Sequence, residues 1–134
     1  MTFEKPVTIA VLNTTDDVIE MLRLVFEQRG FVVVSAQLDD IKRGAVDMEA
    51  FARQHRPAAI VYDIPPPYDR HWTFMNHMRH MPELAGIPFV ITTTNARRLQ
   101  EIVGTDAQVL EIVGKPYDLD QIVNAVTSAI DSNA

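Results

Sequence analysis

Short apolar runs alternate with amphipathic segments along almost the whole chain, and this alternation is what most constrains the fold. Short apolar strands that alternate with amphipathic helices predict a parallel sheet with helices on both faces. We therefore expect a single α/β domain over 1–134, with its core at about 6–131. The strands are expected at 7–12, 31–36, 58–63, 87–92 and 109–113, and the helices at 17–29, 48–55, 69–81, 96–103 and 119–130.

Two segments carry more local detail. In the first helix, Glu20 follows Asp17 by three residues, which resembles a capping box, and Gly30 is placed to end the helix. The segment 37–46 is polar and mixed in composition, so we expect a long loop or a loose extra turn there.

Composition narrows the class of protein. The 134 residues are 47% hydrophobic and 22% charged, as in an ordinary globular domain. A net charge of −6 argues against nonspecific nucleic-acid binding, which needs a basic face. The chain has no cysteine, which excludes disulfides and thiolate metal sites. No apolar run reaches the roughly 18 residues of a membrane span, and the N-terminus lacks a secretory pattern, so we expect a cytoplasmic protein without membrane contact.

Three predicted strands end in chemically complementary side chains. Ligands of open parallel sheets bind beyond the carboxyl ends of the strands. Asp63, Thr93 and Lys115 stand at three such ends, and Pro116 follows the lysine. A carboxylate can act as a nucleophile, while a hydroxyl and an ammonium can hold the oxygens of a phosphoryl group. This combination favours phosphoryl transfer to Asp63.

At these positions the chain resembles the receiver domain of bacterial two-component response regulators. "PAAIVYDIPPP" is similar to the family's phosphoacceptor strand and loop, with Asp63 as the acceptor and Pro67 as the loop proline. "IPFVITTT" and "VGKPYDLDQIVNAV" are similar to its fourth strand and its Lys-Pro segment, and the spacings between Asp63, Thr93 and Lys115 match as well. The resemblance implies a flavodoxin-like doubly wound sheet of five parallel strands in the order 2-1-3-4-5, with five helices on both faces.

The resemblance also implies a function. A receiver domain takes a phosphoryl group from a sensor histidine kinase or a phosphotransfer protein and is not an enzyme in the usual sense. Its output then passes to a downstream protein, by resemblance through the face of the fourth helix, fifth strand and fifth helix. Residues Arg97, Arg98, Gln100 and Glu101 are candidates on that face. A homodimer is a further expectation, and nucleic acid is not an expected partner.

The chain departs from the family at the end of the first strand. The family carries an acidic pair there, whereas this chain has Asn13 and Thr14. Asp16 and Asp17 come too late in the chain to replace that pair, because they belong to the start of the helix. Since Mg²⁺ is normally held by carboxylates together with phosphate oxygens and water, we expect a weak Mg²⁺ site.

The remaining ligands expected for such a weak site are the Asp63 carboxylate, the backbone carbonyl of Pro65, and Asn13 and Thr14. A second departure is Ile112, which stands where the family often has an aromatic residue that reports phosphorylation.

Alternatives stay open at this point. One is a pseudo-receiver that docks to partners without being phosphorylated, which the Asn13–Thr14 change favours.

His77 and His80 fall on one face of a predicted helix and permit metal binding. The methionines and Phe74 of that helix instead favour an apolar face on the sheet and histidines in water. A flavin site is disfavoured because "NTTDD" has no glycine and places acids where a phosphate would sit.

Overall fold

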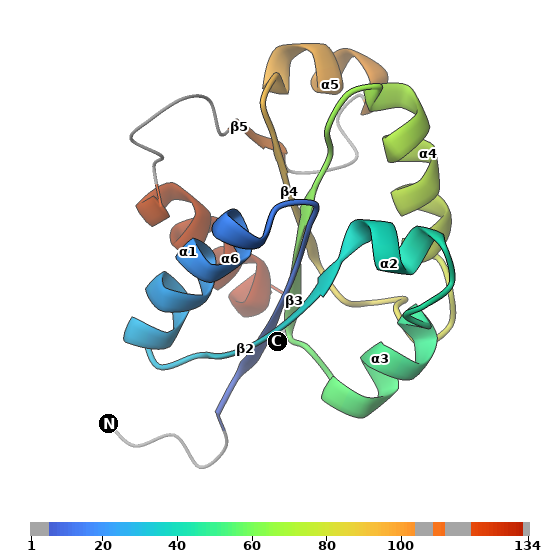
Figure 1. The fold of residues 1–134 in the computed structure, drawn as a ribbon. Helices are drawn as coiled ribbons and strands as arrows, with labels where there is room; N and C mark the ends of the chain where they lie inside the picture. Colours follow the sequence, from blue (N-terminus) through green and yellow to red (C-terminus); the bar gives the residue numbers. More distant parts are fainter. Residues whose placement is uncertain (1–5, 104–108, 112–118, 133–134) are drawn as a thin grey trace.

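A parallel sheet with helices on both faces forms the framework of the protein (Figure 1). The computed structural model describes residues 6–103, 109–111 and 119–132. Within them, five parallel strands lie in the order β2-β1-β3-β4-β5, so the predicted α/β class with a parallel sheet is confirmed. The strands are β1 (Thr8–Asn13), β2 (Val32–Gln37), β3 (Ala59–Asp63), β4 (Phe89–Thr93) and β5 (Val109–Glu111).

The described part of the chain contains six helices, where the sequence predicted five. Several boundaries shift by one or two residues, as is usual where helices and strands end. The helices are α1 (Asp16–Gln28), α2 (Leu38–Lys42), α3 (Met48–His55), α4 (Tyr68–Arg79), α5 (Ala96–Val103) and α6 (Leu119–Ser132). None of them has the length and apolarity needed to cross a bilayer.

The additional helix, α2, lies in the segment that was expected to be a long loop or loose turn. Leu38 and Ile41 are three residues apart, so they share one face of the short helix, and both are buried against the sheet. Burial of this face stabilises a helix of only five residues that would not be stable alone. The prediction was wrong here because two apolar residues in a polar segment are too weak a pattern to stand out.

The sheet separates the core into two clusters, one on each of its faces, and helices cover both. Helices α1 and α6 cover one face, and α2 to α5 cover the other (Figure 1). Successive residues of a strand point to opposite faces, so Ile9 and Val11 of β1 pack under α1 while Ala10 and Leu12 pack on the other side. This alternation later decides which polar side chains meet at the ends of the strands.

Backbone hydrogen bonds stabilise both ends of helix α1. Its N-cap residue, Thr15, makes no side-chain cap, and the helix begins at Asp16, so the predicted Asp17–Glu20 capping box is wrong. The two aspartates of the first turn still suit the positive end of the helix dipole. At the other end Gly30 has φ 89° and its N–H donates to the Glu27 carbonyl, so the predicted glycine stop is confirmed.

Candidate functional site

Asp63 is the last residue of β3 and lies half-buried at the carboxyl edge of the sheet. The Thr92 hydroxyl donates a hydrogen bond of 3.0 Å to Oδ1 of Asp63. Burial raises the pKa of the Asp63 carboxyl, and the hydrogen bond from Thr92 opposes that rise. A carboxylate is therefore held in a partly desolvated place, and among the described residues only its Oδ1 is bonded by a side chain.

The strand register explains why Thr92 meets Asp63. Asp63 lies directly opposite Thr92 in the pairing of β3 with β4. Asp63 lies two residues after Val61, and Thr92 lies two residues after Val90. Both valines belong to the core cluster under α1 and α6. The period of two in a strand therefore turns both polar side chains toward that same face.

Thr93, the hydroxyl chosen from the sequence, lies one residue further and points to the opposite face. Its hydroxyl donates to the backbone carbonyl of Ile64 at 2.8 Å, and its side chain is fully buried. Thr93 thus holds the residue that follows Asp63 and makes no hydrogen bond to the Asp63 carboxylate. The sequence pointed to Thr93 and not to Thr92, because the adjacent threonines give no polar–apolar alternation that would choose between them.

Asn13 brings a third polar side chain to this edge. Leu12 lies opposite Tyr62, so the next residue of each strand, Asn13 in β1 and Asp63 in β3, stands at the ends of adjacent strands. Asn13 is only 4% exposed, and its Oδ1 accepts the Thr15 backbone N–H at 3.0 Å. The half-buried Thr14 follows in the turn to α1. The Asn13 amide oxygen therefore shapes the turn between β1 and α1.

Buried polar side chains are concentrated at this end of the sheet. Among the residues whose side chains are described, those that are polar and buried are Asn13, Thr92 and Thr93, and all three stand at carboxyl ends of strands. Burying polar groups costs free energy unless they are hydrogen-bonded, so such a cluster marks this edge as the candidate site.

The loop after Asp63 is fixed to the end of β4. The Ile64 N–H donates to the Thr92 carbonyl at 2.8 Å, in addition to the Thr93 contact. Further along, Tyr68 Oη lies 3.2 Å from Oγ1 of Thr94. Pro65 is half-buried, whereas Pro66 and Pro67 are exposed and are joined by a cis peptide bond.

Asp16 and Asp17 do not join the site. Both are exposed in the first turn of α1, and the Gln37 amide at the end of β2 donates to Asp16. The possible metal ligands described near Asp63 are neutral oxygens. No cluster of three or more metal-ligating side chains occurs among the described residues. This donor set fits a tightly bound Mg²⁺ poorly.

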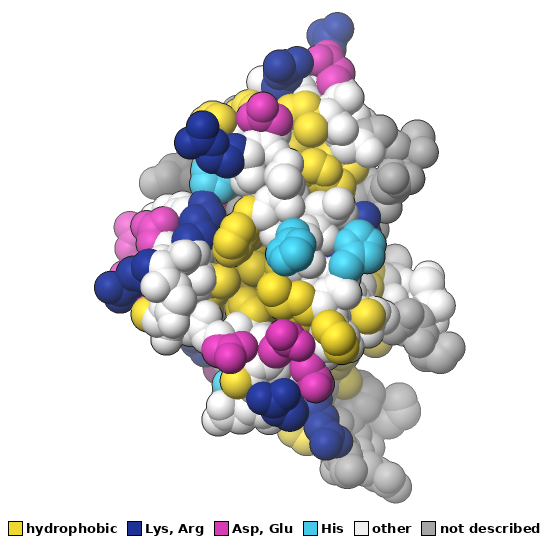
Figure 2. Space-filling view, turned by 90° about the vertical axis from the view of Figure 1, so that its right-hand side faces the viewer, with side chains coloured by type: hydrophobic (Ala, Val, Ile, Leu, Met, Phe, Trp, Pro, Cys, Tyr) yellow, Lys and Arg dark blue, Asp and Glu magenta, His cyan; other side chains and the backbone are white. Residues whose placement is uncertain are grey.

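The two histidines considered as metal ligands, His77 of α4 and His80 directly after it, lie at the surface. His77 and His80 are exposed, and Nδ1 of His80 donates to the Asn76 carbonyl at 2.7 Å. Figure 2, which views the molecule from the side of α4, shows histidine side chains on the surface next to hydrophobic ones. In the described part of the chain they form no metal cluster.

Other predicted residues fall outside the site or outside the described part. Lys115, Pro116 and Ile112 lie outside the described residues, so the approach of the lysine to Asp63 stays a prediction. The four candidate docking residues are all exposed on α5, where Arg98 pairs with Glu101 at 3.1 Å; these four are Arg97, Arg98, Gln100 and Glu101.

Comparison with known proteins gives structural but not sequence matches. No protein-family model matches this chain, and no curated protein matches it by sequence. A response regulator receiver protein from Sinorhizobium medicae matches with a TM-score of 0.69 at 20% identity, over 97% of this chain and 98% of that one.

Two further solved structures match over similar lengths. A sensor protein from Polaromonas sp. has a TM-score of 0.73 at 19% identity, covering 97% of this chain and all of its own. A chemotaxis protein from Vibrio cholerae has a TM-score of 0.66 at 16% identity, with 93% and 99% covered. The sheet order and these matches agree: the chain has the fold of response regulator receiver domains.

Proposed function

We propose that this chain is a receiver module of a phosphorelay and accepts a phosphoryl group on Asp63. The observation that carries the proposal is the position of Asp63, at the end of β3 in a receiver fold, with Thr92 bonded to one carboxylate oxygen. The other oxygen attacks phosphorus while the bond to the donor's leaving group breaks, which leaves an aspartyl phosphate. The phosphodonor would be a sensor histidine kinase or a phosphotransfer protein, so the chain is not an enzyme in the usual sense.

The protein's own groups assist this step by position and charge. The Asp63 carboxyl must be ionised to attack, and the Thr92 hydrogen bond favours that form against the effect of burial. In this role Lys115 would neutralise charge on the transferred phosphoryl group, and the Thr93 hydroxyl would donate a hydrogen bond to one of its oxygens. The present Thr93 contact, to the Ile64 carbonyl, would have to be exchanged for that purpose.

A weakened dependence on Mg²⁺ is part of the proposal. Asn13 and Thr14 offer neutral oxygens where the family offers carboxylates, and the amide oxygen of Asn13 already accepts the Thr15 N–H. Asp16 is bonded by Gln37, away from Asp63. A divalent cation would therefore be held chiefly by Asp63 and the Pro65 carbonyl, with low affinity.

The same contacts favour a second candidate, a pseudo-receiver that binds partners without phosphorylation. The single carboxylate of Asp63 and the Asn13 amide, which accepts the Thr15 N–H, are compatible with a fixed conformation at the carboxyl edge of the sheet. In either case the output passes through a protein partner at the face of α5, β5 and α6. Arg97, Arg98, Gln100 and Glu101 would contact that partner, and self-association into a homodimer is a variant of the same proposal.

Reaction with a small phosphodonor tests the proposal. The chain is incubated with phosphoramidate or acetyl phosphate, with and without Mg²⁺, and its intact mass is recorded. We expect one added phosphoryl group, little changed by omission of Mg²⁺, and none in Asp63→Asn. The matched control is Asp69→Asn, which changes an exposed acid of α4 and should still be modified.

The two candidates give opposite results. Absence of an adduct at millimolar Mg²⁺, together with full partner binding by Asp63→Asn, would support the docking module and reject the phosphoacceptor. The fluorescence of Trp72, the single tryptophan, supplies a parallel measure of cation binding near the start of α4.

A further inference from the structure

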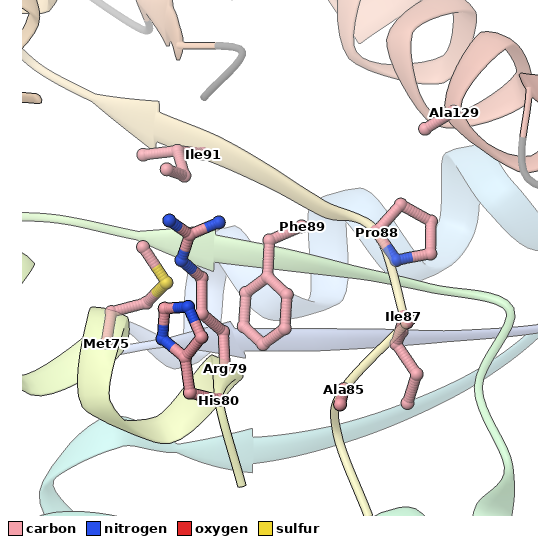
Figure 3. Close-up of a pocket in the computed structure, with 10 residues that line it drawn as sticks. Met75, Arg79, His80, Ala85, Ile87, Pro88, Phe89, Ile91 and Ala129 are labelled. Carbon is pink, nitrogen blue, oxygen red and sulfur yellow. The ribbon is translucent and has the colours of Figure 1, made fainter. Parts of the chain in front are cut away.

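A second site lies at the opposite end of β4 from Asp63. A cavity of about 400 Å³ opens between the end of α4, the segment that returns to the sheet, and the first residues of β4 (Figure 3). Phe89 begins β4 and lies opposite Ile60, whereas Thr92 lies opposite Asp63 at the other end of the strand. The cavity is therefore separate from the candidate phosphoacceptor site. Its volume falls in the range of small-molecule pockets.

Arg79 supplies the charge of this cavity. The residue is half-buried as a whole, with Nε donating to Oδ1 of Asn76 at 2.8 Å and Cζ lying 5.5 Å from the ring centroid of Trp72. Within the described residues no carboxylate pairs with it, although arginines 23, 29, 43, 53 and 98 each have an acidic partner. In a chain of net charge −6, this is a cation held in place by Asn76 and Trp72, and its Nη groups have no acceptor among the described residues.

His80 stands beside Arg79 and is fixed by the same residue. Its Nδ1 lies 2.7 Å from the backbone carbonyl of Asn76. A carbonyl oxygen only accepts, so Nδ1 carries the proton and Nε2 is the ring nitrogen that remains. Asn76 thus orients both polar groups, one through its side chain and one through its backbone. Figure 3 shows the imidazole and the guanidinium next to each other on one side of the cavity.

Apolar side chains form the rest of the lining. Met75, Phe89 and Ile91 surround the guanidinium in Figure 3. The Phe89 ring is itself held against Tyr62, with the ring centroids 6.2 Å apart. One oriented cation among apolar walls is the combination that selects a ligand with one anionic group and an apolar body.

We propose that this cavity binds a small organic acid, with its carboxylate on the Nη groups of Arg79 and its apolar body against Phe89 and Ile91. The planar guanidinium presents two parallel donors that match the two oxygens of a carboxylate. Its contact with Asn76 and Trp72 reduces the freedom that it would lose on binding. Neither Asp63 nor its phosphorylation is needed for this binding.

Benzoate serves as the test ligand, because it joins a carboxylate to an aromatic ring. Trp72 is the only tryptophan and lies against Arg79, so its fluorescence reports the event. We expect a saturable change with benzoate, and weaker binding of benzyl alcohol and benzamidine, which carry the same ring with a neutral or positive group. Calorimetry on the full chain gives a second readout that does not depend on Trp72.

Variants separate this site from general surface binding. Arg79→Gln should weaken benzoate binding at least ~10-fold, because a charged hydrogen-bonded pair is lost. Arg79→Lys should retain part of the affinity, and Arg97→Gln, an exposed arginine of α5, should retain all of it. A melting curve for each variant shows that the fold is intact.

Three results would overturn the assignment. These are no saturable response to benzoate, equal affinity of Arg79→Gln and the unchanged chain, or equal affinity for benzoate and benzyl alcohol. Asp63→Asn should bind benzoate normally, so failure of phosphorylation and failure of ligand binding are distinguishable.

Discussion

The hydroxyl of Thr92 donates to the carboxylate of Asp63 across adjacent strands at 3.0 Å. The two residues are direct partners in the register of β3 with β4. One oxygen of the carboxylate is thereby fixed in orientation, and the hydrogen bond opposes the rise in the pKa of Asp63 that burial causes. The neighbouring hydroxyl of Thr93 instead fixes the loop that begins at Ile64.

Replacing each threonine by valine should separate these two roles. In Thr92→Val the pKa of Asp63 should rise, because the hydrogen bond that lowers it is lost. We also expect the free energy of unfolding to fall by about 1–3 kcal/mol, since a half-buried acceptor loses its donor. NMR titration of the Asp63 carboxyl carbon and urea unfolding measure the two effects.

Thr93→Val is the matched control for that change. It should reduce stability by about 1 kcal/mol through the Ile64 carbonyl and leave the titration of Asp63 almost unchanged. A larger pKa change in Thr93→Val than in Thr92→Val would contradict the assignment of the contact.

The buried position of Asp63 predicts a pH-dependent stability difference. Burial raises the pKa of Asp63 in the folded state, so the folded chain binds a proton more tightly than the unfolded chain. The resulting contribution is fully present below the unfolded pKa of about 3.9 and is lost as pH rises through the folded pKa. Asp63→Asn, which does not ionise, should therefore be more stable than the unchanged chain near neutral pH.

This gain should shrink as the pH is lowered toward the unfolded pKa of aspartate. Urea unfolding of both chains over the acidic range measures it. A stability difference that stays constant with pH would mean that burial of the charge is not its cause. Asp69→Asn, which changes an exposed acid of α4, is measured in parallel as the control.

The hydroxyl of Tyr62 offers a stabilising substitution. Tyr62 is 1% exposed, and its Oη is the one buried side-chain polar atom without a hydrogen-bond partner among the described residues. Burial raises the pKa of Tyr62, so the phenol stays protonated. Tyr62→Phe keeps the ring and removes the unpartnered group, which should raise stability by about 1–3 kcal/mol in chemical unfolding.

Tyr68→Phe provides the comparison, because it removes a hydroxyl that has a partner in Thr94. That change should leave stability unchanged or lower it slightly. If Tyr62→Phe were the more destabilising of the two, the hydroxyl of Tyr62 would have to be satisfied in solution.

Lys42 of α2 and His71 of α4 are in contact, and we expect the stability that this contact contributes to depend on pH. The Lys42 ammonium donates to Nδ1 of His71 and lies 5.8 Å from the ring centroid of Phe74. Burial lowers the pKa of His71, and the charges on Lys42 and Arg70 lower it further, against a smaller opposing effect of Asp39. Stability contributed here is present above the unfolded pKa of about 6.5 and is lost as pH falls through the folded pKa.

Lys42→Met should raise the pKa of His71 and make stability less sensitive to mild acid. Lys42→Arg keeps the charge and should leave the pKa of His71 low. Proton NMR of the imidazole, assigned with His71→Gln, measures both. Identical His71 titrations in Lys42→Met and in the unchanged chain would show that Lys42 does not influence the imidazole.

Several features of the candidate site were predictable from local patterns. The apolar run that ends in Asp63 placed this acid at the carboxyl edge, and the same reasoning placed Asn13 and Thr93 at neighbouring strand ends. The contact made by Thr92 was not predictable in the same way, because adjacent threonines at the end of β4 give no polar–apolar alternation. Helix α2 was missed because its burial depends on the sheet beneath it.

The α/β class and the acid that ends the third strand could be predicted from the sequence, because strand and helix periodicity depends on neighbours in the chain, and composition gave the net negative charge. Tertiary structure alone decided which hydroxyl meets Asp63 and which walls enclose Arg79. Those relationships join residues from separate elements. They depend on the register between strands, on the pleat that turns alternate side chains to opposite faces, and on where the chain returns to the sheet.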